Sequence, residues 1–142
     1  MFNIAICDDE ETLIDELKEN LIMYAAETNK EFCFFIYHDG IELLQEYRSD
    51  YDLIFMDAAK GQYIHFLPDI LKLMPEGGVL LSDNVLQDGD VCESRFAVTR
   101  RNRTIHARMR DYLYELKHHE ELRTDILPVG DGMTISVRIS KP

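Results

Sequence analysis

Apolar residues along the chain fall into short, compact runs separated by longer amphipathic stretches. The clearest run ends at Asp57 and is apolar throughout, from Leu53 to Met56. A run of this kind, bounded by polar residues, is typical of a parallel strand buried on both faces. Similar runs occupy residues 3–7, 32–37 and 79–81, and a further strand is expected over residues 124–127. Residues 133–139 instead alternate between apolar and polar. These patterns predict six strands.

The stretches between the runs carry apolar residues at helical spacing. The first helix is expected to follow Thr12, its predicted N-cap, and to end near Thr28. Its predicted buried face consists of Ile14, Leu17, Leu21 and Ala25. A short second helix is predicted over residues 41–47, capped by Asp39, and further helices over residues 62–74 and 104–119.

Strands that alternate with helices at this spacing indicate right-handed βαβ units and a parallel sheet. The tight turn Gly130-Asp131-Gly132 before the last strand indicates an antiparallel hairpin at one side of it. We therefore expect one α/β domain over residues 1–142, a three-layer α/β/α sheet of Rossmann-like or flavodoxin-like type. Its six strands should follow the order 2-1-3-4-6-5, with only the last strand antiparallel.

Charge and cysteine content narrow the partners and the compartment. Asp and Glu outnumber Lys and Arg by 27 to 15, a formal net charge of -12. So acidic a chain repels phosphate backbones and anionic lipids, and we expect no nucleic-acid or membrane partner. Three scattered cysteines, no signal peptide and no membrane-length apolar run indicate a cytoplasmic protein. We expect a monomer or a weak homodimer.

Acidic residues follow three of the predicted strands. Asp8 and Asp9 come after the first, Asp57 after the third, and Asp83 with Asn84 after the fourth. Because parallel strands end side by side, these side chains should meet at one edge of the sheet. Carboxylates brought together repel one another unless a hard cation joins them, and oxygen ligands suit magnesium or calcium. The pattern predicts a weak divalent-cation site.

Residues 1–57 resemble the receiver domain of bacterial response regulators. The resemblance rests on Ile6-Cys7-Asp8-Asp9-Glu10 and on the run from Asp52 to Asp57. It implies that Asp8 and Asp9 bind a metal and that Asp57 accepts a phosphoryl group, with Ser82 as the hydroxyl residue. The lysine that receivers carry after their fifth strand has no counterpart, since Lys141-Pro142 is the C-terminal tail. We therefore expect no kinase partner.

Residues 52–142 resemble the cation-dependent O-methyltransferases related to caffeoyl-CoA methyltransferase. The matching motifs are Asp57-Ala58-Ala59-Lys60-Gly61-Gln62-Tyr63, Gly77 to Leu86, Arg100 to Thr104 and Leu127 to Gly132. The resemblance implies that Asp57, Asp83 and Asn84 bind the cation, which acidifies the reacting hydroxyl. It also implies that Lys60 lies near that hydroxyl.

The part that binds S-adenosylmethionine (SAM) in such enzymes is not recognisable. Its glycine-rich turn after the first strand is replaced by Cys7-Asp8-Asp9-Glu10-Glu11, although Asp39 could imitate the ribose-binding acid. We therefore expect SAM not to bind. The leading hypothesis is an engineered fold chimera of the two families, without complete natural activity, and not an enzyme. The alternatives are a truncated SAM-dependent O-methyltransferase and a variant phosphoacceptor receiver domain.

Overall fold

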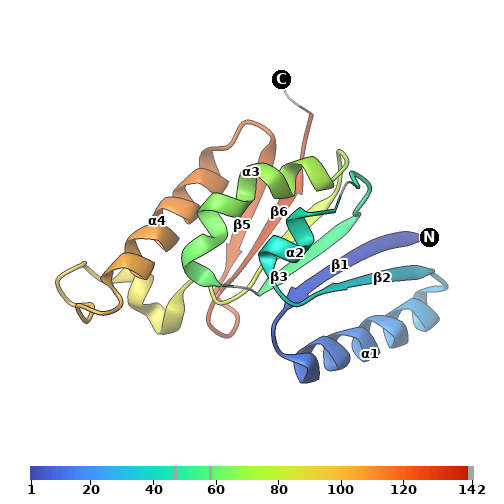
Figure 1. Cartoon of the computed structure of the whole chain (residues 1–142), viewed down its shortest axis with the longest axis horizontal. Helices are drawn as coiled ribbons and strands as arrows, with labels where there is room; N and C mark the ends of the chain where they lie inside the picture. Colours follow the sequence, from blue (N-terminus) through green and yellow to red (C-terminus); the bar gives the residue numbers. More distant parts are fainter. Residues whose placement is uncertain (47, 58, 141–142) are drawn as a thin grey trace.

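The computed structural model describes residues 1–46, 48–57 and 59–140. Within them, strands and helices alternate as predicted through the first half of the chain (Figure 1). The strands are β1 (Phe2–Asp8), β2 (Phe32–Tyr37), β3 (Leu53–Asp57), β4 (Val79–Ser82), β5 (Leu122–Leu127) and β6 (Met133–Arg138). The α-helices are α1 (Glu11–Thr28), α2 (Gly40–Leu44), α3 (Tyr63–Leu73) and α4 (Arg103–His118), and two 3₁₀ helices are η1 (Lys60–Gln62) and η2 (Gln87–Cys92).

The strands form one sheet in the order β2-β1-β3-β4-β6-β5. The first four are mutually parallel, and β6 runs antiparallel to both neighbours. Both the predicted order and the predicted antiparallel last strand are confirmed. The register places Asp8 beside Asp57 and Met56 beside Ser82, so β1, β3 and β4 end at one carboxyl edge.

The larger core lies between the sheet and the helices α2, α3 and α4. Three fully buried tyrosines, Tyr51, Tyr63 and Tyr112, anchor it. On the strands nearest α4, several side chains facing this layer are polar and buried, namely Ser82, Thr124, Thr134 and Ser136. Three of them bond one another or α4: the Ser82 hydroxyl lies 2.7 Å from the Tyr112 hydroxyl, and those of Thr124 and Ser136 are 2.9 Å apart. The Thr134 hydroxyl has no hydrogen-bond partner among the described residues.

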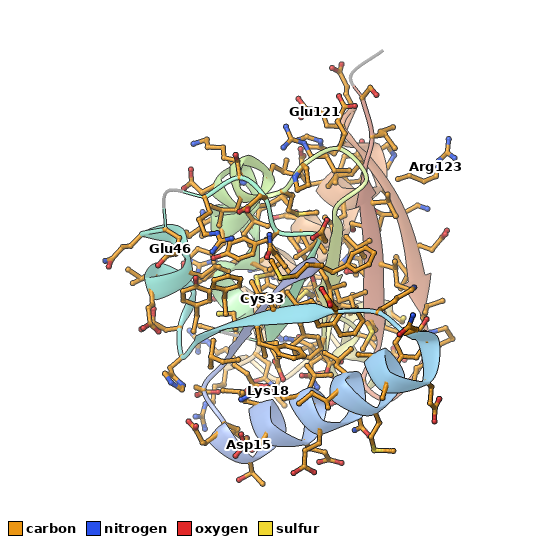
Figure 2. The ribbon with its side chains drawn as sticks, turned by 90° about the vertical axis from the view of Figure 1, so that its right-hand side faces the viewer. Asp15, Lys18, Cys33, Glu46, Glu121 and Arg123 are labelled. Atoms are coloured by element: carbon orange, nitrogen blue, oxygen red, sulfur yellow. The ribbon has the colours of Figure 1, made fainter. Side chains whose placement is uncertain are left out.

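The opposite face of the sheet carries a smaller core built around α1. Ile4, Ile6 and Ile14 are its buried members, and α1 packs over β1 and β2. Figure 2 shows α1 running alongside β2, while Arg123 projects outward from β5. The cross-strand rows Leu53–Val79–Val137 and Phe55–Leu81–Ile135 continue this apolar face over β3, β4 and β6. Among the described residues, α1 is the only helix on this side.

Two local predictions differ from the structure at helix ends. Thr12 is not a cap, because α1 begins at Glu11 with Glu10 as its N-cap. Asp8 instead accepts the backbone N–H of Glu10 at 2.8 Å, a bond that depends on where β1 ends. The predicted Asp39 cap is confirmed by the N–H of Glu42 at 2.7 Å. The second helix is shorter than predicted, and Tyr47 lies outside the described residues.

Candidate functional site

The site residues come from the ends of β3 and β4 at the carboxyl edge. Asp57 is the last residue of β3, and Asp83 directly follows β4. The Asp83 N–H donates to the carbonyl of Met56 at 3.1 Å, which ties the two strand ends together. Burying the apolar runs of both strands therefore brings two acids from distant parts of the sequence to one point.

Tyr63, at the start of α3, lies beneath this point. Its buried hydroxyl is 3.3 Å from the carbonyls of Met56 and Asp83 and 3.5 Å from Oδ1 of Asp57. Its ring packs edge-on against Tyr112 at 5.4 Å. Through these contacts, Tyr63 helps to position both Asp57 and Asp83. We assigned Tyr63 no role from the sequence, although it stands six residues after Asp57 in the motif.

Asn84 turns its side chain back toward Asp57. It adopts φ +55°, a left-handed conformation that asparagine tolerates better than most residues. Its amide lies 3.0 and 3.1 Å from the two carboxylate oxygens of Asp57 and also contacts Asp131 at 3.4 Å. The turn before β6 fixes this loop, because Val85 and Leu86 donate to the carbonyls of Gly132 and Asp131. Asp131 is a second residue that sequence reasoning missed.

The spacing at Asn84 suits a divalent cation. In an octahedral magnesium shell with bonds of about 2.1 Å, neighbouring oxygens lie about 3.0 Å apart. If the nitrogen of the Asn84 amide faces Asp57, it donates a hydrogen bond to the carboxylate. If the amide oxygen faces Asp57, that oxygen and the carboxylate oxygens have the spacing of neighbouring magnesium ligands. The Asp83 carboxylate instead accepts the Asn84 N–H at 2.7 Å. Accordingly, no three His, Cys, Asp or Glu side chains among the described residues form a ready metal group. Cation binding stays a prediction.

Asp8 and Asp9 have different surroundings. Asp8 is 3% exposed and stands beside Asp57 in the sheet, whereas Asp9 is exposed. Burial raises the pKa of the Asp8 carboxyl, and the charges of Asp9 and Asp83 act in the same direction. The hydrogen bond from Glu10 opposes them. The Asp8 carboxylate therefore adds to the repulsion between negative charges at this edge.

The sequence also placed Ser82 and Lys60 at this point. Ser82 is fully buried and faces α4, where Tyr112 binds its hydroxyl, so it does not present a hydroxyl at the carboxyl edge. The backbone of Lys60 opens η1, but its side chain lies outside the described part of the structure.

Two adjoining cavities open at the carboxyl edge. One of about 680 Å³ reaches Asp57, Asn84 and Ile105, and one of about 440 Å³ reaches His38, Asp39 and Phe66. Asp9, Ala59 and Gln62 line both of them. The site therefore combines an acidic, oxygen-rich centre with space for an extended small molecule.

Comparison with known proteins assigns this arrangement to a family. The family model for O-methyltransferases matches residues 8–139. A candidate caffeoyl-CoA O-methyltransferase of Arabidopsis thaliana is 31% identical over 108 residues, covering 74% of this chain and 47% of the relative. Caffeoyl-CoA O-methyltransferase 1 of the same plant is 36% identical, covering 72% and 40%. The chain thus spans about half the length of the curated relatives it matches.

Solved structures agree on the fold. A candidate caffeoyl-CoA O-methyltransferase from Staphylococcus aureus is 25% identical with a TM-score of 0.67, covering 96% of this chain and 76% of that one. An O-methyltransferase from Bacillus cereus, solved in complex with S-adenosylhomocysteine (SAH), has a TM-score of 0.62 at 19% identity, covering 96% and 73%. Among the described residues, no helix combines the length and apolarity needed to cross a bilayer.

These findings correct the leading hypothesis. The family match starts at residue 8 and continues past Asp57 without a break, so an engineered chimera is wrong. The segment that resembled a receiver domain lies almost entirely inside this match. Acids at the ends of β1 and β3 are a feature of carboxyl edges in α/β sheets generally and do not by themselves identify a receiver. The alternative of a methyltransferase fits better, and the chain belongs to the O-methyltransferase family.

Proposed function

We propose that this chain transfers a methyl group from SAM to a hydroxyl oxygen at the carboxyl edge of its sheet. The observation that carries the proposal is the meeting of Asp57, Asp83 and Asn84 beside the 680 Å³ cavity. All three residues lie inside the segment that matches the family model. The relatives named for caffeoyl-CoA support a catechol-type hydroxyl as the acceptor.

The two cavities and their charge support SAM as the methyl donor, against our expectation from the sequence. The acids at positions 8–11 repel the carboxylate of SAM. SAM also carries a sulfonium and an ammonium, and acidic walls favour both cations. Asp39 follows β2, where an acid can bind a ribose hydroxyl, and it lines the 440 Å³ cavity. Several solved relatives hold SAM or SAH.

Asp57, Asp83 and Asn84 would hold the divalent cation, with Tyr63 keeping the two acids in place. When bound, such a cation lowers the pKa of a coordinated hydroxyl and so supplies an oxygen nucleophile. Asp83 accepts the Asn84 N–H at Oδ1 only, so its second carboxylate oxygen would be the one to join the ligands. The acidic lining of the cavity also attracts the cation before it binds.

Radioactive methyl transfer tests the proposal. Protein, labelled SAM and caffeoyl-CoA or a simple catechol would be incubated with millimolar magnesium or with a chelator. We expect product only with magnesium, and a loss of at least about 100-fold in Asp57→Asn, since one ligand of the nucleophile-generating site is removed. Asp69→Asn is the matched control, because Asp69 is exposed on α3 and pairs with Lys72.

Binding is measured separately, by calorimetric titration with SAH. Micromolar binding without turnover would support the cofactor site but contradict the acceptor chemistry. Absence of both binding and turnover would refute the proposed function.

A further inference from the structure

A hollow of about 230 Å³ lies between α4 and the loop that joins η2 to this helix. It is lined by Arg95, His106, Ala107, Arg110 and Asp111. In Figure 1 the loop extends beyond the N-terminal end of α4. Ile105, which lines the 680 Å³ cavity, stands on a different face of this helix. The α4 hollow is thus separate from the carboxyl edge, and the proposed methyl transfer makes no use of it.

His106 lines the α4 hollow and has one ring nitrogen without a partner. Only 2% of this residue is exposed. Its Nε2 lies 3.2 Å from the carbonyl oxygen of Glu93, and a carbonyl only accepts, so Nε2 carries a hydrogen. In the neutral ring Nδ1 is then an acceptor, and it is buried without a hydrogen-bond partner among the described residues. A buried acceptor of this kind requires a donor from water or from a ligand.

The segment around the hollow is strongly basic within an acidic chain. Residues 94–110 contain six arginines and no acidic residue, whereas the whole chain has a net charge of -12. None of these arginines forms an ion pair with a carboxylate in the described part of the chain. Arg110 instead donates to the carbonyls of Val91 and Glu93, both at 3.4 Å. Positive charge gathered without counter-charges favours an anion as the ligand.

One acid on the wall of the hollow restricts which anion fits. The exposed Asp111 carboxylate accepts hydrogen bonds and donates none. A fully ionised anion such as sulfate offers only acceptors, so it would be repelled by Asp111 and would leave Nδ1 of His106 unsatisfied. A phosphate group that still carries a proton has an O–H to donate as well as charged oxygens that accept from guanidinium groups. It therefore matches the mixture of donors and acceptors in the hollow.

The charged walls are free to close around such a ligand. Arg95, Arg110 and Asp111 are all exposed. The Nδ1 atom of His106 is covered in this structure, so a ligand reaches it when these exposed side chains rearrange. Arginine suits this role, because its planar fork of N–H groups matches the spacing of phosphate oxygens.

We propose that the α4 hollow binds a phosphate group in a proton-bearing form. Arg95 and Arg110 bind its charged oxygens, and its O–H donates to Nδ1 of His106. A second O–H, where the group carries one, donates to Asp111. Inorganic phosphate and phosphate monoesters share this chemistry. The inference goes beyond methyl transfer and does not depend on it.

Nuclear magnetic resonance of the histidine rings provides the readout. The 142-residue chain, with its five histidines labelled with nitrogen-15, is titrated with sodium phosphate or sodium sulfate at neutral pH and constant ionic strength. His106→Gln identifies the His106 signal, since the amide keeps a donor for Glu93. We expect phosphate to shift the Nδ1 signal of His106 saturably. Sulfate should bind at least about tenfold more weakly, because it has no proton to donate.

Variants on the wall of the hollow locate the contact. Arg95→Gln should weaken phosphate binding about five- to tenfold, since a charge-assisted hydrogen bond is lost. Arg101→Gln is the matched control, because Arg101 is exposed in the same segment but does not line the hollow; binding should stay within about twofold. Asp111→Asn should strengthen sulfate binding about two- to fivefold by removing a like charge. Unfolding midpoints are recorded for all three.

Methyl phosphate distinguishes the two sources of the phosphate group. It is compared with inorganic phosphate at equal concentrations of their proton-bearing forms. Binding within about tenfold of inorganic phosphate extends the site to phosphate groups carried on larger molecules. Weaker binding restricts the site to free phosphate. Both results support the site.

Three results would overturn the proposal. One is no saturable change at His106, which would leave water as the partner of Nδ1. Another is equal binding of sulfate and phosphate, which would mean that the proton of the ligand has no role. The third is equal weakening by the Arg95 and Arg101 substitutions, which would indicate diffuse attraction to the basic segment. Methyl transfer is not measured, so failure here leaves the proposed function standing.

Discussion

The buried contact between Ser82 and Tyr112 yields a quantitative stability test. It links the end of β4, one residue before Asp83, to the middle of α4, and both side chains are fully buried. Burial raises the pKa of the Tyr112 hydroxyl, which therefore stays protonated and able to donate. Removing one partner leaves the other buried without its hydrogen bond, at a cost of about 1–3 kcal/mol.

Tyr112→Phe keeps the ring that packs on Tyr63 and removes only the hydroxyl. Unfolding 142 residues releases about 0.3 kcal/mol per kelvin of entropy at the midpoint, so this loss corresponds to a lower Tm of about 3–10 °C. Ser82→Ala should cost a similar amount. In the double variant neither polar group is left unpaired, so its loss should fall about 1–3 kcal/mol short of the sum of the single losses.

Urea denaturation followed by circular dichroism measures the four free energies of unfolding, with the m-value as a check on two-state behaviour. Tyr114→Phe is the matched control, because Tyr114 is 65% exposed on the same helix and should change stability by less than about 0.5 kcal/mol. Additive losses in the double variant would refute the reasoning, since they would mean that the two hydroxyls do not depend on each other.

Further predictions concern the carboxyl edge. Asp57→Asn should raise the Tm of the metal-free protein by relieving repulsion with Asp8 and Asp83. The same substitution should remove the stabilisation by millimolar magnesium. Sodium chloride at matched ionic strength is the control and must not reproduce that stabilisation. Because the raised pKa of Asp8 makes the native state bind its proton more tightly, stability should fall as pH rises from about 3.9 through the native pKa. Asp8→Asn should remove that fall and gain stability only above this window, and parallel pH profiles would contradict the assignment. Gly132→Ala should destabilise by more than about 2 kcal/mol in the same urea assay, because at φ +85° its Cβ would lie 2.2 Å from Cγ of Leu86; an unchanged midpoint would contradict this.

The strand order was predictable because the first four strands are compact apolar runs whose neighbours follow from βαβ handedness, and because the tight turn and the alternating last run indicated the antiparallel hairpin. The meeting of Asp57, Asp83 and Asn84 followed from the same rule, since Asp57 ends β3 and the other two follow the end of β4. Tyr63 and Asp131 escaped prediction because their contacts cross between β3, β4 and the turn before β6. Those contacts depend on tertiary packing, which no local pattern contains.

The mistaken chimera has a physical origin as well. Asp8, Asp9 and Asp57 look like one family and Asp83-Asn84 like another, because every carboxyl edge of this kind gathers polar residues. The glycine-poor turn after β1 strengthened the error. There the Asp8 side chain accepts the N–H of Glu10, so an acid holds the turn in place of the glycines that the resemblance to SAM-binding enzymes led us to look for.

The outward-facing apolar rows over β4 and β6 have a colloidal consequence. Near neutral pH the charge of -12 keeps molecules apart, so the rows remain separated in solution. Around the isoelectric point of about 4.7 that repulsion vanishes, while the apolar surface stays the same. Solubility should therefore pass through a sharp minimum there, and salt that screens charge should broaden it. Charge, more than the chemistry of this sheet face, governs how concentrated the protein can become.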